Sequence, residues 1–190
     1  NVLEALKSQG FSGFAAINRL DKETSGIMVL ANCSKVSAGL QKSMAQATTV
    51  KTYNAILKGD LGEIGSTGSW NRPLTNKAEG RKNPQGIKSD RIKCLTYFEV
   101  LSCNKYMSLI ALTLGSGRQH QIRKHAVLSK HQVLGDKRYG DRKYNTMISK
   151  RYKNDTMALH SKKLKFVYLE KTFDFEVDLP SSWQVFNIGV

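Results

Sequence analysis

The chain has 190 residues, and its 30 Lys and Arg against 15 Asp and Glu give a formal net charge of +15. This length can bury a core, and a composition of 40% apolar and 24% charged residues is typical of a soluble globular protein. The sequence contains no apolar run of the roughly 20 residues that a membrane span needs, and no basic amphipathic helix. The charge favours a polyanionic partner, above all nucleic acid, over a charge that serves only solubility.

The cysteines and histidines argue against disulfide and metal chemistry. Cys33, Cys94 and Cys103 are odd in number and form no C-x-x-C pair, which is typical of reduced thiols in a cytoplasmic protein. His120 and His125 are five residues apart, not the four that would align two ligands on one helix face. We therefore expect a cytoplasmic location and no metal site.

The first half of the chain predicts two helices and two strands. A short helix is expected over residues 2–8, and the apolar run at 26–31 predicts a buried strand. Ser34 is the expected N-cap of a helix over residues 35–47. The alternation of residues 51–57 predicts the second strand.

The middle of the chain combines a loop with a strand pair and a helix. Residues 62–91 are the least regular part, and the six basic residues of segment 77–93 predict a long basic loop with room for one hairpin. Segments 95–101 and 107–114 predict paired strands, and a helix introduced by glycines is expected near residues 120–129.

Segment 137–153 carries seven Lys or Arg against one acid, with Tyr139, Tyr144 and Tyr152 among them. Aromatic faces interleaved with positive charge are typical of proteins that bind single-stranded nucleic acid. Segments 163–169 and 172–179 then predict a hairpin.

The strict alternation in the second strand of this hairpin predicts one buried face and one solvent-exposed face. Taken with the earlier elements, this strand-rich order with few helices predicts an α+β fold. We expect a mostly antiparallel mixed sheet with flanking helices and long basic loops.

Two segments carry candidate chemistry. Residues 18–26, N-R-L-D-K-E-T-S-G, place Asp21 directly before a turn and a predicted strand, where it would lie at the lip of a sheet rather than in bulk water. Taken alone, the commoner explanation is a surface pair of Arg19 and Asp21 that caps a turn.

The second segment, G-S-G-R-Q-H-Q-I-R-K-H at residues 115–125, brings Arg118, His120 and Arg123 within two helical turns. It is not a P-loop, because its glycine spacing differs and no Lys-Ser or Lys-Thr follows. Taken alone, it is equally the pattern of a phosphate-binding helix start with no catalytic role.

Together these segments resemble the RluA family of pseudouridine synthases. Five elements follow the family order between residues 17 and 169: N-R-L-D-K-E-T-S-G at 18–26, K-T-Y at 51–53, G-R-Q-H-Q-I-R-K-H at 117–125, G-D-K-R-Y-G at 135–140 and L-H at 159–160. The run Y-G-D-R-K-Y-N at 139–145 is most similar to the RluC-type enzymes, which act on large-subunit ribosomal RNA. Asn18, Gln119 and Ser161 depart from the family's His, Thr and Ala, but the acid, the tyrosine and the second arginine are all present. The family's upstream lysine-proline strand is missing, so we expect one catalytic domain, residues 1–190, truncated at its N-terminus.

The resemblance implies an RNA uridine isomerase that breaks the N1–C1′ bond, turns the base and joins C5 to C1′, with no cofactor and no metal. Asp21 would be the catalytic carboxylate, which either attacks C1′ or takes a proton from C2′. Arg123 would pair with Asp21, and Tyr53 would stack on the uracil. Arg19 would fill the space left by the flipped base, and Leu159 would supply an apolar wall. On the sequence alone, Tyr53 is as readily a core aromatic.

The implied partner is RNA, with 23S ribosomal RNA expected and tRNA as the alternative, and the protein is expected to be a monomer that binds no membrane. The expected RNA-binding residues are basic: Arg118, Lys137, Arg138, Arg142, Lys143, Lys150 and Arg151. A non-catalytic RNA-binding or ribosome-assembly factor would need this charge but not the acid. A phosphate-ester hydrolase would need a metal cluster or a nucleophile elbow, which the sequence lacks.

Overall fold

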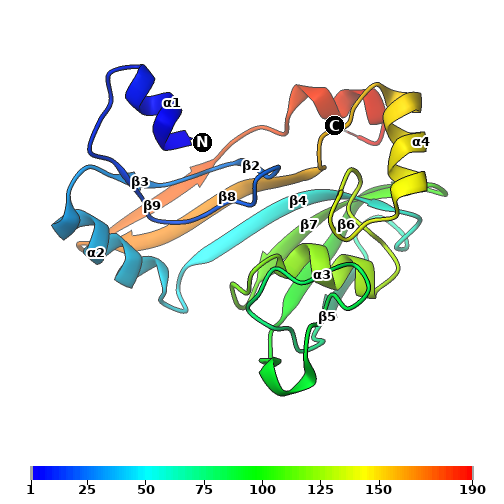
Figure 1. The fold of residues 1–190 in the computed structure, drawn as a ribbon, viewed down its shortest axis with the longest axis horizontal. Helices are drawn as coiled ribbons and strands as arrows, with labels where there is room; N and C mark the ends of the chain where they lie inside the picture. The colour runs from blue at the N-terminus through cyan, green and yellow to red at the C-terminus, as the bar shows by residue number, and fades with distance from the viewer. Residues whose placement is uncertain (1, 190) are drawn as a thin grey trace.

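The computed structural model describes residues 2–189 and contains a seven-stranded mixed sheet flanked by helices (Figure 1). The strand order is β2-β8-β4-β7-β6-β5, and β9 pairs with β8. Every pairing described in this sheet is antiparallel except that of β2 with β8, which confirms the predicted α+β class. The strands are β2 (Ser25–Gly26), β4 (Val50–Lys58), β5 (Thr67–Trp70), β6 (Thr96–Asn104), β7 (Met107–Leu114), β8 (Leu159–Tyr168) and β9 (Lys171–Glu176).

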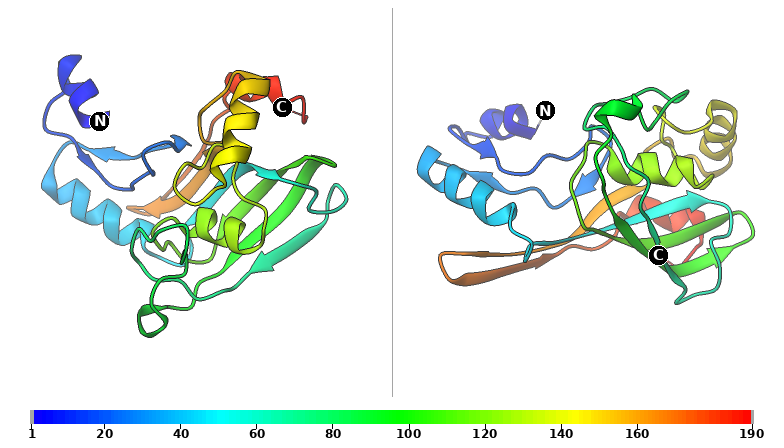
Figure 2. Two further views of the ribbon diagram at one scale, coloured as in Figure 1. Left: turned by 45° about the vertical axis from the view of Figure 1, so that its right-hand side comes forward. Right: turned by 90° about the horizontal axis from the view of Figure 1, so that it is seen from below.

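The helices lie around this sheet and beside a second, two-stranded sheet of β1 (Ala15–Ala16) and β3 (Leu30–Ala31). Figures 1 and 2 show α2 and α4 at opposite ends of the molecule, with α3 between them over the sheet. No helix within residues 2–189 is long and apolar enough to cross a membrane. The helices are α1 (Val2–Ser8), α2 (Ser34–Met44), α3 (Gln121–Leu128) and α4 (Arg142–Tyr152), with 3-10 turns at Lys88–Asp90 and Ser181–Phe186.

Three apolar clusters hold these elements together. Ala55 and Leu57 of β4 pack with Ile122 of α3, whereas Ile56 packs on the other face with Ile148 of α4. Successive side chains of a strand point to opposite faces, so the alternation predicted for residues 51–57 is confirmed. The third cluster joins α2 and β3 to β8: Ala31, Leu40, Met44, Leu164 and Phe166.

Several predicted elements are confirmed with small changes at their ends. The helix at 2–8, the strand pair at 95–101 and 107–114, and the helix near 120–129 are α1, β6 with β7, and α3. Helix α2 ends at Met44, and its N-cap is Cys33 rather than Ser34, because Cys33 is the residue with extended backbone before the first turn.

The single buried strand predicted at 26–31 is wrong. Gly26 ends β2 with a left-handed backbone, φ 106°, and the chain then crosses to the other sheet, where β3 begins at Leu30. Of these six residues only Ala31 is buried. The break requires glycine, because a Cβ at Gly26 would lie 2.3 Å from the carbonyl oxygen of Ser161.

The C-terminal hairpin forms as β8 and β9, but the buried face predicted for it is wrong in part. Phe173 is half-buried, whereas Phe175 and Val177 are 44% and 38% exposed. The reason is that β9 pairs only with β8, and α2 packs against β8. The alternation identified the strand, but it did not show how far the covering helix extends.

Two elements lie where the sequence predicted none. The edge strand β5 interrupts the segment predicted as irregular, and α4 begins after Asp141, whose side chain accepts a hydrogen bond from the backbone N–H of Tyr144. The interpretation of the nearby tyrosines as stacking surfaces for RNA is wrong for Tyr139. Its ring is only 1% exposed and so belongs to the core. Tyr144 and Tyr152 are half-buried against the cluster that contains Ile148, and their role in RNA binding stays a prediction.

The close approach at Gly26 gives a stability prediction. Gly26→Ala adds a methyl group against the β8 backbone in a left-handed conformation, and we expect it to lower the free energy of unfolding by about 3 kcal/mol. Gly10→Ala is the matched control, because Gly10 also has a positive φ but no atom within 4 Å of the place that the added methyl group would take, so its cost should be about 1 kcal/mol. Urea unfolding of both variants measures this; equal costs would show that the contact with β8 is unimportant.

Candidate active site

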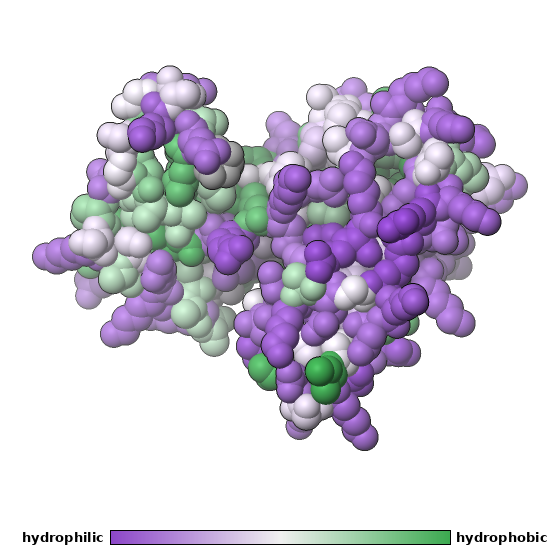
Figure 3. Space-filling view, in the orientation of Figure 1, coloured by the Kyte–Doolittle hydropathy of each residue, from purple (hydrophilic) through white to green (hydrophobic). Residues whose placement is uncertain are grey.

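A cleft of about 720 Å³ opens between residues 17–24, strand β4 and the start of α3. Figure 3 shows this face hollowed between a part with many apolar side chains, over β1, β3 and α2, and a strongly hydrophilic part over α3 and α4. The structure brings all the predicted catalytic and supporting residues to this cleft: Arg19, Asp21, Tyr53, Arg123 and Leu159.

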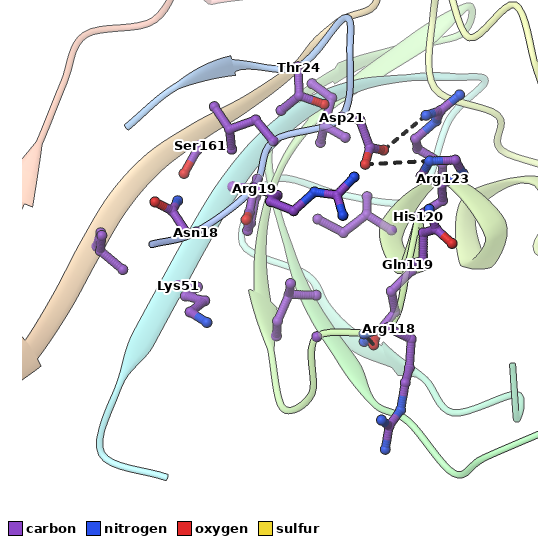
Figure 4. A pocket seen from close by; sticks show the side chains of 18 of the residues that line it. Asn18, Arg19, Asp21, Thr24, Lys51, Arg118, Gln119, His120, Arg123 and Ser161 are labelled. Atoms are coloured by element: carbon purple, nitrogen blue, oxygen red, sulfur yellow. Dashed lines mark hydrogen bonds and ion pairs between the residues drawn. The ribbon is translucent and has the colours of Figure 1, made fainter. Parts of the chain in front are cut away.

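The loop that carries the acid is closed by the side chain of Asn18. Its amide nitrogen donates to the carbonyl oxygen of Ile27 at 3.2 Å, and its amide oxygen accepts from the backbone N–H of Val29 at 2.7 Å. Within the loop, the N–H of Thr24 donates to the carbonyl oxygen of Asp21 at 2.9 Å. Asn18, which departs from the family's histidine, thus fixes both ends of the turn, and Asp21 faces α3 (Figure 4).

The central contact of the site joins Asp21 to Arg123. Arg123 Nη1 donates to Asp21 Oδ2 at 2.9 Å, while its Nε and Nη2 each donate to one oxygen of Asp136 at 2.8 Å. The side chains of Arg123 and Asp136 are 8% and 1% exposed, and that of Asp21 is 23% exposed. The pair predicted from the resemblance is therefore present. Asp136 is a third member that the sequence did not predict, although it lies in the G-D-K-R-Y-G element.

Burial and ion pairing have opposite effects on the pKa values of the two buried groups, Asp136 and Arg123. Burial alone would raise the pKa of Asp136, but the hydrogen bonds and charge of Arg123 hold it below its ordinary value of 3.8. Burial also works against the charge of Arg123, yet Asp136 and Asp21 together raise its pKa. Both groups therefore stay ionised, and the fixed guanidinium presents an N–H of Nη1 to Asp21.

His120 approaches Asp21 from the other side. Its Nε2 lies 3.6 Å from Asp21 Oδ1, and its Nδ1 lies 2.9 Å from the hydroxyl oxygen of Tyr139. Burial lowers the pKa of His120, as do the nearby charges of Arg123, Arg138 and Lys124, against the opposing effect of Asp21. The sequence alone assigned His120 no role, although it lies between Arg118 and Arg123 in the second motif.

The wall opposite α3 is formed by Tyr53, Leu159 and Ser161. Tyr53 pairs with Ser161 across a β-bulge, where β4 and β8 shift register between Thr52 and Tyr53. Burial raises the pKa of Tyr53, so its hydroxyl is protonated at neutral pH. Leu159 is 3% exposed and packs in the apolar cluster that contains Ile122, so it belongs to the core and also forms part of the cleft wall.

The predicted RNA-binding residues differ in their position relative to the cleft. Arg118 is half-buried in the cleft wall, whereas the residues on α4 are exposed outside it: Arg142, Lys143, Lys150 and Arg151. Lys137 lies 3.2 Å from Glu23, which ties residues 136–140 to the Asp21 loop. Arg138 donates from Nε to the carbonyl oxygen of Glu79 at 2.8 Å, so its guanidinium also supports the fold.

The basic loop at residues 74–92 is fastened to α3 beside the cleft. It is closed by an isolated antiparallel bridge between Leu74 and Ile92, and residues 74–92 contain no strand, so the hairpin for which the sequence left room does not form within this loop. Lys124 is fully buried and donates from Nζ to the carbonyl oxygens of Thr75 and Lys77, at 2.9 and 2.8 Å. Lys124 therefore anchors the backbone of this loop to α3 next to Asn76, which lines the cleft.

The profile of the RNA pseudouridylate synthase family matches residues 3–127. The chain is 30% identical to ribosomal large subunit pseudouridine synthase D of Zymomonas mobilis, over 94% of this chain, and it spans 58% of that protein's length. It is 28% identical to tRNA pseudouridine synthase C of Vibrio vulnificus, over 96% of this chain and 79% of that protein. The fold is similar to human RNA pseudouridylate synthase domain containing 1, with a TM-score of 0.80, 23% identity, and coverage of 97% of this chain and 76% of that one.

The buried triad predicts an acid-sensitive contribution to stability. Because the pKa of Asp136 is lower in the folded than in the unfolded protein, its contribution is fully present above 3.8 and is lost as the pH falls through the folded value. We expect Asp136→Asn to cost about 3 kcal/mol at neutral pH, since it leaves Arg123 short of a charged partner, and to cost progressively less below pH 3.8.

Urea unfolding of wild type and variant across this pH range provides the measurement. Asp155→Asn is the control, because Asp155 is 76% exposed and only 4.0 Å from Lys137, so its cost should stay within about 0.5 kcal/mol. A cost for Asp136→Asn that does not change with pH would contradict the assignment.

Proposed function

Since the chain belongs to the RNA pseudouridylate synthase family, we propose that it isomerises uridine to pseudouridine in structured RNA, with Asp21 as the catalytic carboxylate. The observation that carries this proposal is the contact of Asp21 with Arg123 inside the cleft. An acid that only caps a surface turn is not expected to pair with a buried arginine that is itself bound by a second acid.

The reaction needs a carboxylate near the sugar and a pocket that retains the freed base. The N1–C1′ bond breaks, the uracil turns, the C5–C1′ bond forms, and the proton on C5 is removed while N1 gains one, so the product is an isomer. Arg123 holds Oδ2 of Asp21, which leaves Oδ1 for the sugar. Attack at C1′ and proton removal at C2′ both fit this arrangement.

The cleft walls suit a flipped uridine. We assign stacking on the uracil to Tyr53, whose protonated phenol stands on the wall opposite α3, and the apolar contact to Leu159. Arg19 is exposed and points from the Asp21 loop toward α3 (Figure 4), a position from which it can fill the gap that the base leaves in the RNA.

The RNA backbone is proposed to cross the hydrophilic part of the face in Figure 3. A net charge of +15, the fixed basic loop at 74–92 and the exposed cations of α4 support this path. In this arrangement Arg118 and Lys137 contact the RNA nearest to the cleft, and Arg138 contributes charge while it holds the loop. We further propose that the protein works as a monomer in the cytoplasm.

Ribosomal RNA of the large subunit, 23S, is the proposed substrate. Support comes from the 30% identical relative whose name gives that substrate and from the RluC-like run at 139–145. The relative at 28% identity, named for tRNA, makes tRNA the second candidate. In both cases an unpaired or loop uridine is favoured, because flipping costs least there.

The central prediction concerns Asp21→Asn, which keeps the shape of the side chain but removes its charge and nucleophilic oxygen. We expect release of tritium from RNA labelled at uridine C5 to fall below detection, while filter binding of the same RNA is retained, because remote contacts supply most of the affinity.

Asp155→Asn is the matched control, since it makes the same chemical change at a carboxylate that is 76% exposed and does not line the cleft, and it should be dispensable for turnover. Full tritium release by a folded Asp21→Asn protein would exclude the proposed mechanism. An RNA-binding factor without catalysis would give no release even in the wild type.

A second prediction concerns the RNA path. Replacement of Lys143, Lys150 and Arg151 with Ala should weaken RNA binding. It should also reduce the magnitude of the slope of log K against log salt concentration by up to about 2, since each phosphate contact contributes about 0.7 to that slope. The control removes the same charge at the other end of the molecule, with Lys7, Lys35 and Lys171 replaced by Ala. An equal slope in both triple variants would refute an RNA path over α4.

A further inference from the structure

His120 occupies an unusual position at the start of α3. It is the N-cap of the helix, with a left-handed backbone, φ 56°, and its side chain is only 12% exposed. A non-glycine residue rarely adopts this conformation, and where it does the surrounding structure holds it there. The ring of Tyr139 packs edge-on against the imidazole, with centroids 5.7 Å apart.

The groups on the two sides of His120 determine which imidazole nitrogen carries the proton. The carboxylate of Asp21, which lies on the Nε2 side, can only accept. A hydrogen is therefore favoured on Nε2, which leaves Nδ1 to accept from the hydroxyl group of Tyr139, 2.9 Å away. With Nδ1 as acceptor, the neutral imidazole carries its hydrogen on Nε2.

That Nε2–H faces the catalytic carboxylate. Its distance of 3.6 Å from Asp21 Oδ1 is too long for a hydrogen bond in the free enzyme, whereas Oδ2 is already held by Arg123. Catalytic hydrogen bonds are often long in the free enzyme and tighten when substrate binds. Burial and the positive charges of Arg123, Arg138 and Lys124 favour the neutral ring and outweigh the opposing effect of Asp21, so the ring acts as a donor and not as a second counter-charge.

We propose, on the basis of the function proposed above, that His120 is a positioning residue of the reaction, which directs Asp21 Oδ1 at the uridine sugar through its Nε2–H and is itself oriented by Tyr139. Asp21 is then held at both oxygens, by Arg123 from the buried side and by His120 from the cleft side. Rotation of the carboxylate away from the sugar is prevented without neutralising its charge.

Two variants separate positioning from a structural role. In His120→Gln the amide nitrogen takes the place of Nε2 and can still donate to Asp21. In His120→Asn the amide reaches only the place of Nδ1, toward Tyr139, but Asn tolerates the left-handed backbone better than Gln. Positioning predicts that His120→Asn lowers kcat by about tenfold to a hundredfold with little change in KM, the worth of one hydrogen bond to a charged group. His120→Gln should keep kcat nearer to wild type although its melting temperature is the lower of the two.

Tritium release, thermal unfolding and ¹⁵N NMR of the imidazole make the test complete. A wild-type spectrum with the hydrogen on Nε2, which shifts to a mixture of tautomers in Tyr139→Phe, supports the proposal. If the wild type is active but kcat of His120→Asn is higher than that of His120→Gln, activity follows stability, and this inference alone is overturned. A wild-type spectrum with the hydrogen on Nδ1 also overturns it alone. A wild type that releases no tritium overturns the proposed function and this inference with it.

Discussion

The guanidinium of Arg123 is the interaction on which the rest of the site depends. A buried arginine is costly unless its donors are paired, and the two oxygens of Asp136 take up two of them at 2.8 Å. This pairing fixes the plane of the guanidinium, and its Nη1 can then meet only an acceptor on the cleft side. Asp21 fills that place, at 2.9 Å, from a segment more than 100 residues away in the chain. The geometry of the carboxylate is thus set by two buried residues, Arg123 and Asp136.

The fold serves this contact by restricting the loop that carries Asp21. Asn18 closes one side of the loop, and Gly26 allows the chain to pass against the β8 backbone before it enters the second sheet. Lys137 pairs with Glu23 and links the same loop to the segment of Asp136. The cleft therefore lies where two sheets, α3 and two loops converge, which is a common position for a site that must be both rigid and open.

The sequence predicted those features that depend on local periodicity and motifs. The strands β4, β6 and β7 follow from alternation, and the Asp21–Arg123 pair follows from the resemblance of two segments, since neither segment alone required a site. The break at Gly26, the exposure of Phe175 and the burial of Tyr139 were not predictable in this way. Each depends on which element packs nearby, and a pattern within one segment contains no information about that. The contacts of Asp136 and His120 were not predicted for the same reason, because their partners, Arg123 and Asp21, come close only in the folded chain.

The site, as we propose it, exchanges one glycosidic bond for another while it retains the base. The most direct measurement is the nucleoside and base content of unmodified ribosomal RNA after incubation with the protein, by liquid chromatography with mass detection. We expect pseudouridine to appear in an amount equal to the uridine lost, with no free uracil. Free uracil in place of pseudouridine, or an unchanged nucleoside content in RNA that the protein demonstrably binds, would contradict this mechanism.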